Sequence, residues 1–133
     1  MKILIAGAEI NVISVNGINT FIQGVNRDTL EFQFSTVDMD FQTLQNAFTS
    51  ENCKQIKIVD GENIYLHDDY TIRAELSLKP VVIEPETSIT SAVLENRYVV
   101  KMCQMTYAEK MQEETLMKIK MHEDALVELA SII

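Results

Sequence analysis

The sequence predicts a mainly β fold of the α+β class: an antiparallel sandwich or open barrel, with one short helix and a long C-terminal helix. Up to about residue 105, the apolar residues mostly alternate with polar ones, which is the period of a β-strand. From residue 106 to residue 133 they recur every three or four positions, and no Gly or Pro interrupts them. We therefore expect a β-rich domain over residues 1–105, with a short helix near 40–49, and an amphipathic helix over 106–133.

The first part of the chain is expected to open with a hairpin. Lys2 to Ala6 and Ile10 to Val15 have the composition of strands, and Asn16-Gly17 is the dipeptide that favours a type I′ turn. Alternation then resumes over residues 18–22. Residues 24–28 are predicted to form a loop before the next strand, whose buried face carries Leu30, Phe32 and Phe34.

The short helix is predicted from a change of spacing after that strand. Asp38 and Asp40 offer side-chain acceptors for a helix N-cap. Phe41, Leu44 and Phe48 then follow at intervals of three and four residues. A helix of this length is expected to pack on the sheet.

The remaining strands follow the same alternation. A second hairpin is predicted over residues 56–66, with its turn at 60–63, and the clearest strand runs from Tyr70 to Lys79. We expect this strand to stop at Pro80, which has no backbone donor, with Val81 to Ile83 continuing it beyond a bulge. Glu84 to Asn96 is polar and is expected to form a long loop or flexible arm, before a last strand over residues 97–105.

The C-terminal helix begins with the pattern of a capping box, in which Thr106 and Glu109 bond each other's backbone amides. Because a lone helix is marginally stable in water, this helix needs a surface to pack on. Two arrangements stay open: it folds back along its own sheet, or it packs against another subunit. In the second case the expected contact residues are Leu116, Ile119, Leu126, Leu129 and Ile133.

Composition excludes several classes of partner. The 133 residues carry 20 acidic and 11 basic side chains, a net charge of −9, without a Lys/Arg cluster that could neutralise phosphates. We therefore expect neither nucleic-acid binding nor adsorption to an anionic membrane. The first ten residues are a poor match to a signal peptide, and no apolar run is long enough to span a bilayer, so an intracellular protein is expected.

No pattern in the chain indicates catalysis. Phosphate-binding loops, nucleophile elbows and zinc-protease motifs are absent, so we expect no enzymatic activity, no cofactor and no metal. His67, Asp68 and Asp69, with Asp60 and Glu62 across the hairpin, match no known ligand spacing and are interpreted as a solvated turn. The two cysteines, Cys53 and Cys103, are interpreted as reduced structural thiols.

Two stretches, residues 21–32 (FIQGVNRDTLEF) and 70–80 (YTIRAELSLKP), followed by a helical tail, carry a family resemblance. In this layout the chain resembles small tail or baseplate structural proteins of bacteriophages and prophages of Gram-positive bacteria. The resemblance implies a β module without enzymatic activity that assembles into rings or docks on a tail tube. It also implies a homo-oligomer, or other phage structural proteins as partners, and a location in the host cytoplasm and then in the virion.

An alternative function is a monomeric ligand-binding module. Phe32 and Phe34, together with the methionines, would then line a pocket between the sheet and the helix.

Overall fold

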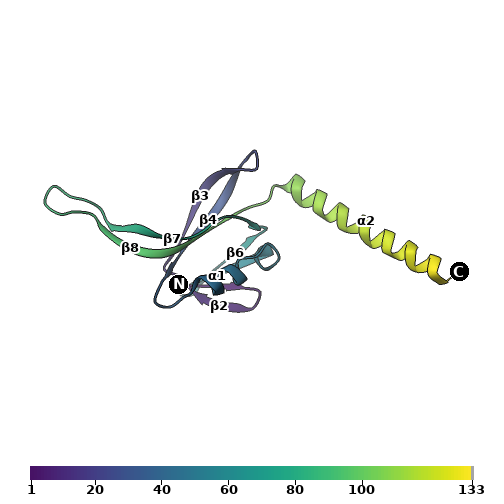
Figure 1. Cartoon of the computed structure of the whole chain (residues 1–133), viewed down its shortest axis with the longest axis horizontal. Coiled ribbons are helices and arrows are strands. Elements are labelled where there is room, and N and C mark those ends of the chain that lie inside the picture. Colours follow the sequence, from purple (N-terminus) through teal and green to yellow (C-terminus); the bar gives the residue numbers. More distant parts are fainter. Residues whose placement is uncertain (133) are drawn as a thin grey trace.

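The structure, a computed structural model, describes residues 1–132, with side chains up to residue 125. Eight strands in this part of the chain form two antiparallel four-stranded sheets (Figure 1). Neither sheet closes on itself, so the predicted mainly β, α+β fold is confirmed as two open sheets, and not as a barrel.

The two sheets divide the strands by position in the chain. The first sheet has the order β2-β1-β5-β6, formed by β1 (Lys2–Ile5), β2 (Ala8–Asn11), β5 (Gln55–Asp60) and β6 (Asn63–Asp68). The second has the order β3-β4-β8-β7, formed by β3 (Ser14–Ile22), β4 (Val25–Ser35), β7 (Ile72–Glu84) and β8 (Val93–Cys103). The edges of the sheets are therefore β2, β6, β3 and β7.

A single hydrophobic core joins the sheets. Ile3 and Ile56 from the first sheet and Phe32 and Phe34 from the second are completely buried in it. Phe48 completes an aromatic cluster, with its ring centroid 5.1 Å from that of Phe32 and 5.7 Å from that of Phe34. Leu30, Phe32 and Phe34 are therefore buried as predicted, and Thr29 and Gln33 on the opposite face of β4 are buried as well.

The predicted position of the opening turn is wrong. Asn16 and Gly17 lie inside β3, paired with Glu31 and Leu30 of β4. The chain turns instead at Ala6-Gly7, between β1 and β2, and at Gln23-Gly24, between β3 and β4, with positive φ at all four residues. The expected loop at 24–28 is likewise wrong, because β4 begins at Val25: extending both strands around a two-residue turn pairs more backbone than a turn at Asn16-Gly17 allows.

The predicted short helix and second hairpin are confirmed. Helix α1 (Phe41–Ala47) begins after Asp40, whose side chain accepts a 2.7 Å hydrogen bond from the amide of Thr43. Leu44 is its buried residue. A 3-10 turn, η1 (Asn52–Lys54), then leads into β5, and Gly61, with φ of 63°, turns the chain into β6.

The predicted stop of the strand at Pro80 is wrong, whereas its predicted continuation over Val81 to Ile83 is confirmed. Strand β7 continues to Glu84, with bulges between Arg73 and Glu75 and between Val82 and Glu84. Proline is tolerated because β7 is an edge strand and has no ladder partner on its outer side. The expected loop over 84–96 is correspondingly shorter, because residues 93–96 belong to β8.

Beyond Arg97 the β7–β8 hairpin leaves the sheet. Among the residues of β8 that pair with β4, Arg97 is the one nearest the tip of the hairpin. Residues 80–96 therefore form a two-stranded projection, here called the arm (Figure 1). Helix α2 (Tyr107–Ile132) projects from the other end of the molecule.

Candidate interaction surface

The start of α2 is closed by the predicted capping box. The amide of Thr106 donates to Oε1 of Glu109 at 2.9 Å, and the amide of Glu109 donates to Oγ1 of Thr106 at 3.2 Å. Both amides lack partners within the helix, so this exchange defines where the helix begins.

The same glutamate also binds the body of the protein. Arg27 of β4 forms a two-point ion pair with Glu109: Nη1 bonds Oε1, and Nη2 donates to Oε2 at 2.8 Å. The Arg27 side chain is only 1% exposed, and its Nε and Nη1 also donate to the carbonyls of Ile22 and Gln104. The hydrogen bond from Arg27 is the main reason why the pKa of Glu109 is lowered to about 2.

A second contact fixes α2 to the segment between the two sheets. Lys110 bonds the carboxylate of Asp69 at 2.9 Å, and Asp69 accepts the amide of Met105 at 2.9 Å through its carbonyl. On the other side, the amide of Gln104 donates to the carbonyl of Asp28. Hydrogen bonds and ion pairs from β4 and from the β6–β7 connection therefore hold residues 104–110, at the start of α2, from two sides. These contacts set the direction in which α2 leaves the two sheets.

Beyond its first turns α2 lies free of the body. The ribbon of α2 points away from both sheets (Figure 1). Every residue from 112 to 125 is exposed, including Leu116 at 60% and Ile119 at 50%. Over these residues the helix does not fold back along its own sheet. Among the other predicted contact residues, Leu126 and Leu129 lie on α2 in the part whose side chains are not described, and Ile133 lies outside the described residues.

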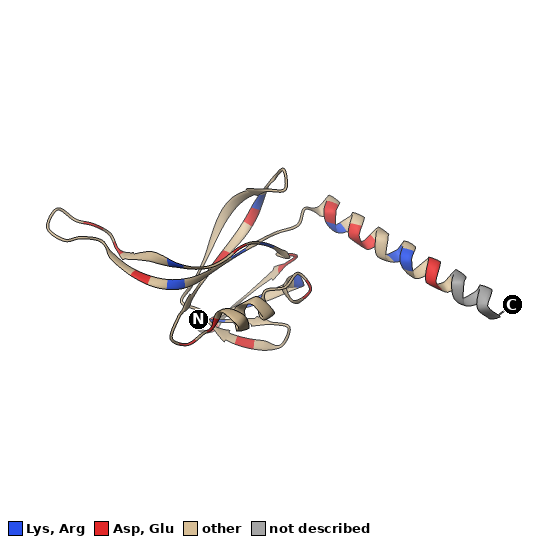
Figure 2. Cartoon of the chain, in the orientation of Figure 1, with Lys and Arg blue, Asp and Glu red and all other residues tan. Residues whose placement is uncertain are grey.

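Acidic and basic side chains are interspersed along α2 rather than segregated at its ends (Figure 2). Leu116 and Ile119, three residues apart, share one side of the helix, and Met117 and Met121 (55% and 70% exposed) lie on another. The free part of α2 therefore offers apolar residues in two bands separated by charged residues.

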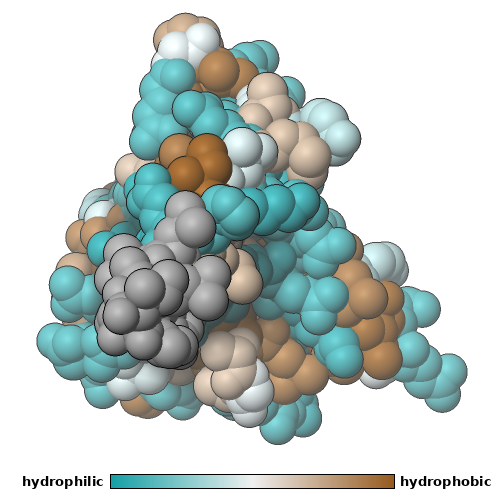
Figure 3. Space-filling model, turned by 90° about the vertical axis from the view of Figure 1, so that its right-hand side faces the viewer, coloured by the Kyte–Doolittle hydropathy of each residue, from teal (hydrophilic) through white to brown (hydrophobic). Residues whose placement is uncertain are grey.

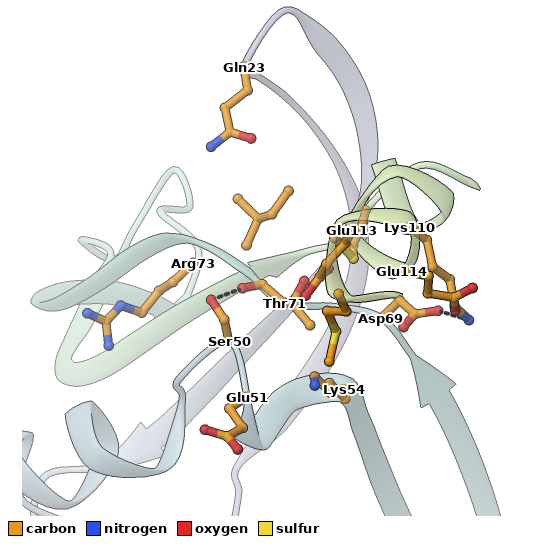
Figure 4. Close-up of a pocket in the computed structure, with 13 residues that line it drawn as sticks. Gln23, Ser50, Glu51, Lys54, Asp69, Thr71, Arg73, Lys110, Glu113 and Glu114 are labelled. Carbon is orange, nitrogen blue, oxygen red and sulfur yellow. Dashed lines mark hydrogen bonds and ion pairs between the residues drawn. The ribbon is translucent and has the colours of Figure 1, made fainter. Parts of the chain in front are cut away.

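A groove lies where α2 leaves the body (Figure 4). It has a volume of about 980 Å³ and is lined by the first turns of α2, the β6–β7 connection and the η1 region. Its walls carry Lys54, Glu113 and Glu114 beside the Asp69–Lys110 pair, with Met105 and Met117 as apolar members. Phe32 and Phe34, which were expected to line a ligand pocket, fill the core instead.

Exposed apolar residues also occur away from α2. The arm carries Val82, Ile89 and Leu94, at 57%, 91% and 57% exposure. On β6, Ile64, Tyr65 and Leu66 are 59%, 51% and 57% exposed. On the side of the molecule from which α2 projects, hydrophobic surface forms separate patches among hydrophilic residues (Figure 3).

Two of these features were missed in the sequence. The loop predicted over residues 24–28 includes Arg27, whose polar neighbours Asn26 and Asp28 give no local signal that it pairs with Glu109, 82 residues away. The exposure of β6 depends on its place at the sheet edge, for which the sequence carries no local signal.

The polar residues near the second hairpin have structural partners. His67 packs edge-on against Tyr70, Asp68 accepts a hydrogen bond from Gln55, and Asp69 binds Lys110. Among the described residues, no group of three or more His, Cys, Asp or Glu side chains is placed to hold a metal ion. Cys53 and Cys103 are both buried free thiols.

Within residues 1–132, no helix combines the length and the apolar character needed to cross a bilayer. Comparisons with family models, with curated proteins and with solved structures find no match to this chain.

Proposed function

We propose that this chain is a non-enzymatic structural protein that assembles through contacts with other subunits, and that α2 is its main contact element. The observation that carries the proposal is the exposure of α2 from residue 112 to residue 125. Most of the stability of a helix in a protein comes from packing an apolar face, and this stretch packs no such face against the described part of its own chain. Leu116 and Ile119 are then contact residues, with Leu126, Leu129 and Ile133 as the predicted continuation.

The anchoring of α2 supports the same role. A helix held by the Arg27–Glu109 and Asp69–Lys110 pairs leaves the body in a defined direction. At 1.5 Å per residue its 26 residues extend about 40 Å, enough to reach across a neighbouring subunit. A defined direction lowers the entropy lost when such a helix docks.

The arm is a second element of this kind. A two-stranded hairpin is marginal in water without further packing, and residues 80–96 pair only with each other within the described chain. Two projections with exposed apolar residues at opposite ends fit a subunit that contacts neighbours on both sides. Together with the resemblance noted in the sequence, this favours a phage or prophage tail or baseplate component, made in the bacterial cytoplasm and incorporated into the virion.

The role of α2 is tested by replacing its apolar residues without changing charge or helix propensity. In Leu116→Gln/Ile119→Gln, two contact residues become polar. In the control, Glu114→Gln/Lys118→Gln, two glutamines are introduced on the other side of the same turns, and the net charge of −9 is also unchanged. Truncation before Thr106 is a poorer test, because it also removes Glu109 from the buried Arg27.

We expect the full chain to form oligomers by light scattering, the Leu116/Ile119 variant to form smaller species, and the control to match the parent. Equal sizes for the two variants and the parent would contradict the role of α2. Circular dichroism establishes that both variants keep the helix.

A monomeric ligand-binding module is the second candidate, and the groove at the base of α2 is the observation that favours it. Its charged walls suit a polar ligand better than the apolar one expected for a pocket lined by phenylalanines. A thermal shift with a panel of polar metabolites, lost in Lys54→Gln and kept in Lys57→Gln, would support this function over assembly.

A further inference from the structure

Strand β6 is an open sheet edge with its backbone available for pairing. It pairs with β5 alone within the described chain. Two observations fix which residues of β6 bond to β5. A two-residue turn joins the paired residues Asp60 and Asn63, and at the other end the amide of Asp69 donates to the carbonyl of Lys54 at 2.8 Å. In that register Asn63, Tyr65 and His67 direct their amides and carbonyls to β5, so those of Ile64 and Leu66 face outward.

Devices that protect sheet edges are missing from this strand. Among the other edges, β7 has Pro80 and two bulges, β2 has four residues, and β3 carries Asn16, Gly17 and Asn19 along its length. Strand β6 has no Pro, Lys or bulge, and its central residues Ile64, Tyr65 and Leu66 are all more than half exposed. At its far end the Asp68 carbonyl already accepts a bond from the Gln104 side chain, which limits the open edge to its centre.

We propose that β6 pairs with β6 of a second copy of this chain, antiparallel and centred on Tyr65. In this register Ile64 of each copy faces Leu66 of the other, and these are the residues whose backbone groups point outward. Two such pairs supply four backbone hydrogen bonds, and Tyr65 meets its own counterpart across the two-fold axis. The register is therefore self-complementary, as a two-fold contact requires, and it joins the two first sheets into one continuous sheet.

The pairing places apolar residues together on both faces. Lys57 and Val59 of β5 lie opposite Leu66 and Ile64, so these side chains share the outer face of the first sheet. Each Ile64–Leu66 contact across the axis would extend this apolar row into the partner. No charged residue lies opposite a like charge among residues 63–67, so nothing in the central segment opposes the pairing.

Cysteine substitution tests this register directly in the full chain. Across the two-fold axis the Cα atoms of the two residues at position 65 would lie about 4.5 Å apart, the spacing of a pair without ladder bonds, and this distance is compatible with a disulfide. Tyr65→Cys is therefore expected to give a disulfide-linked dimer under mild oxidation. Ile64→Cys, at a position that is 59% exposed against 51% for Tyr65 but faces Leu66 of the partner, is expected to remain unlinked. The native thiols Cys53 and Cys103 are buried and do not interfere.

A second measurement separates this contact from the proposed role of α2. In the Leu116→Gln/Ile119→Gln background, we expect a concentration-dependent dimer in light scattering. Leu66→Lys should raise its dissociation constant about tenfold or more. The control for the added positive charge is Val37→Lys, in the turn between β4 and α1, where the valine is 90% exposed, and it should leave the constant unchanged.

The proposal is overturned if Tyr65→Cys and Ile64→Cys cross-link equally, if neither cross-links, or if Val37→Lys weakens the dimer as much as Leu66→Lys. A monomer at all concentrations in the Leu116/Ile119 background, with no cross-link at position 65, would mean that the edge serves another protein or none.

Discussion

Arg27 and Glu109, which are 82 residues apart in the chain, form the contact that attaches α2 to the sheets. Arg27 is buried on β4, and Glu109 is the third residue of the helix, where it also caps the Thr106 amide. One carboxylate therefore starts the helix and sets its direction. Its loss should affect both.

Removing the charge of Glu109 is predicted to destabilise the fold. Glu109→Gln leaves the buried Arg27 guanidinium without an anionic partner, and we expect a loss of about 2 kcal/mol in the free energy of unfolding. Urea denaturation measures this loss. Glu113→Gln, one turn further along α2, is the control, because Glu113 forms no ion pair among the described side chains. Equal effects of the two substitutions would contradict the anchoring role.

The same pair predicts a pH dependence. The pKa of Glu109 in the folded chain, about 2, lies below the ordinary value of 4.5, so the folded state favours the ionised carboxylate. The contribution of Glu109 to stability is then complete above about pH 5 and is lost as the pH falls towards 2. Urea midpoints measured across this range should fall less steeply for Glu109→Gln than for the parent. Parallel curves would show that ionisation of the Glu109 carboxylate does not contribute to the stability of the fold.

The corrected turn position predicts opposite effects for two glycines. Gly24 has φ of 76°, so Gly24→Ala should destabilise the fold by about 1 kcal/mol through backbone strain. Gly17 lies inside β3 with open space around it, and Gly17→Ala should stabilise by about 0.5 kcal/mol. Thermal melts of the two variants distinguish the turns. The reverse order of stability would restore Asn16-Gly17 as the turn.

The thiols are predicted to be unreactive in the native state. Burial raises the pKa of Cys53 to about 12, so almost no thiolate is present near neutral pH. Cys103 lies in β8, is completely buried, and has its sulfur 3.3 Å from the hydroxyl oxygen of Thr29. Alkylation near pH 8 should label neither cysteine until urea unfolds the chain, and mass spectrometry counts the labels. Rapid labelling of native Cys53 would contradict its burial.

Features set by neighbouring residues could be predicted from the sequence. The N-cap at Asp40, the capping box at Thr106 and the alternation over β4 all depend on contacts within a few residues or on a simple period. That β7 runs through Pro80 without a bulge there could not be predicted, because it depends on which neighbour the strand lacks. Gln23-Gly24 was overlooked because Asn16-Gly17 is the stronger local turn signal, and only pairing along the whole hairpin decides between them.

By itself, the sequence determined that a mainly β body would be followed by a helix with apolar residues, because period and capping are local properties of the chain. Only the tertiary structure decided that Arg27 would meet Glu109, that α2 would point away from its own sheets, and that β6 would be an edge. These depend on which distant segments pair, and pairing is decided by the burial of the shared core and by backbone hydrogen bonds summed over the whole molecule.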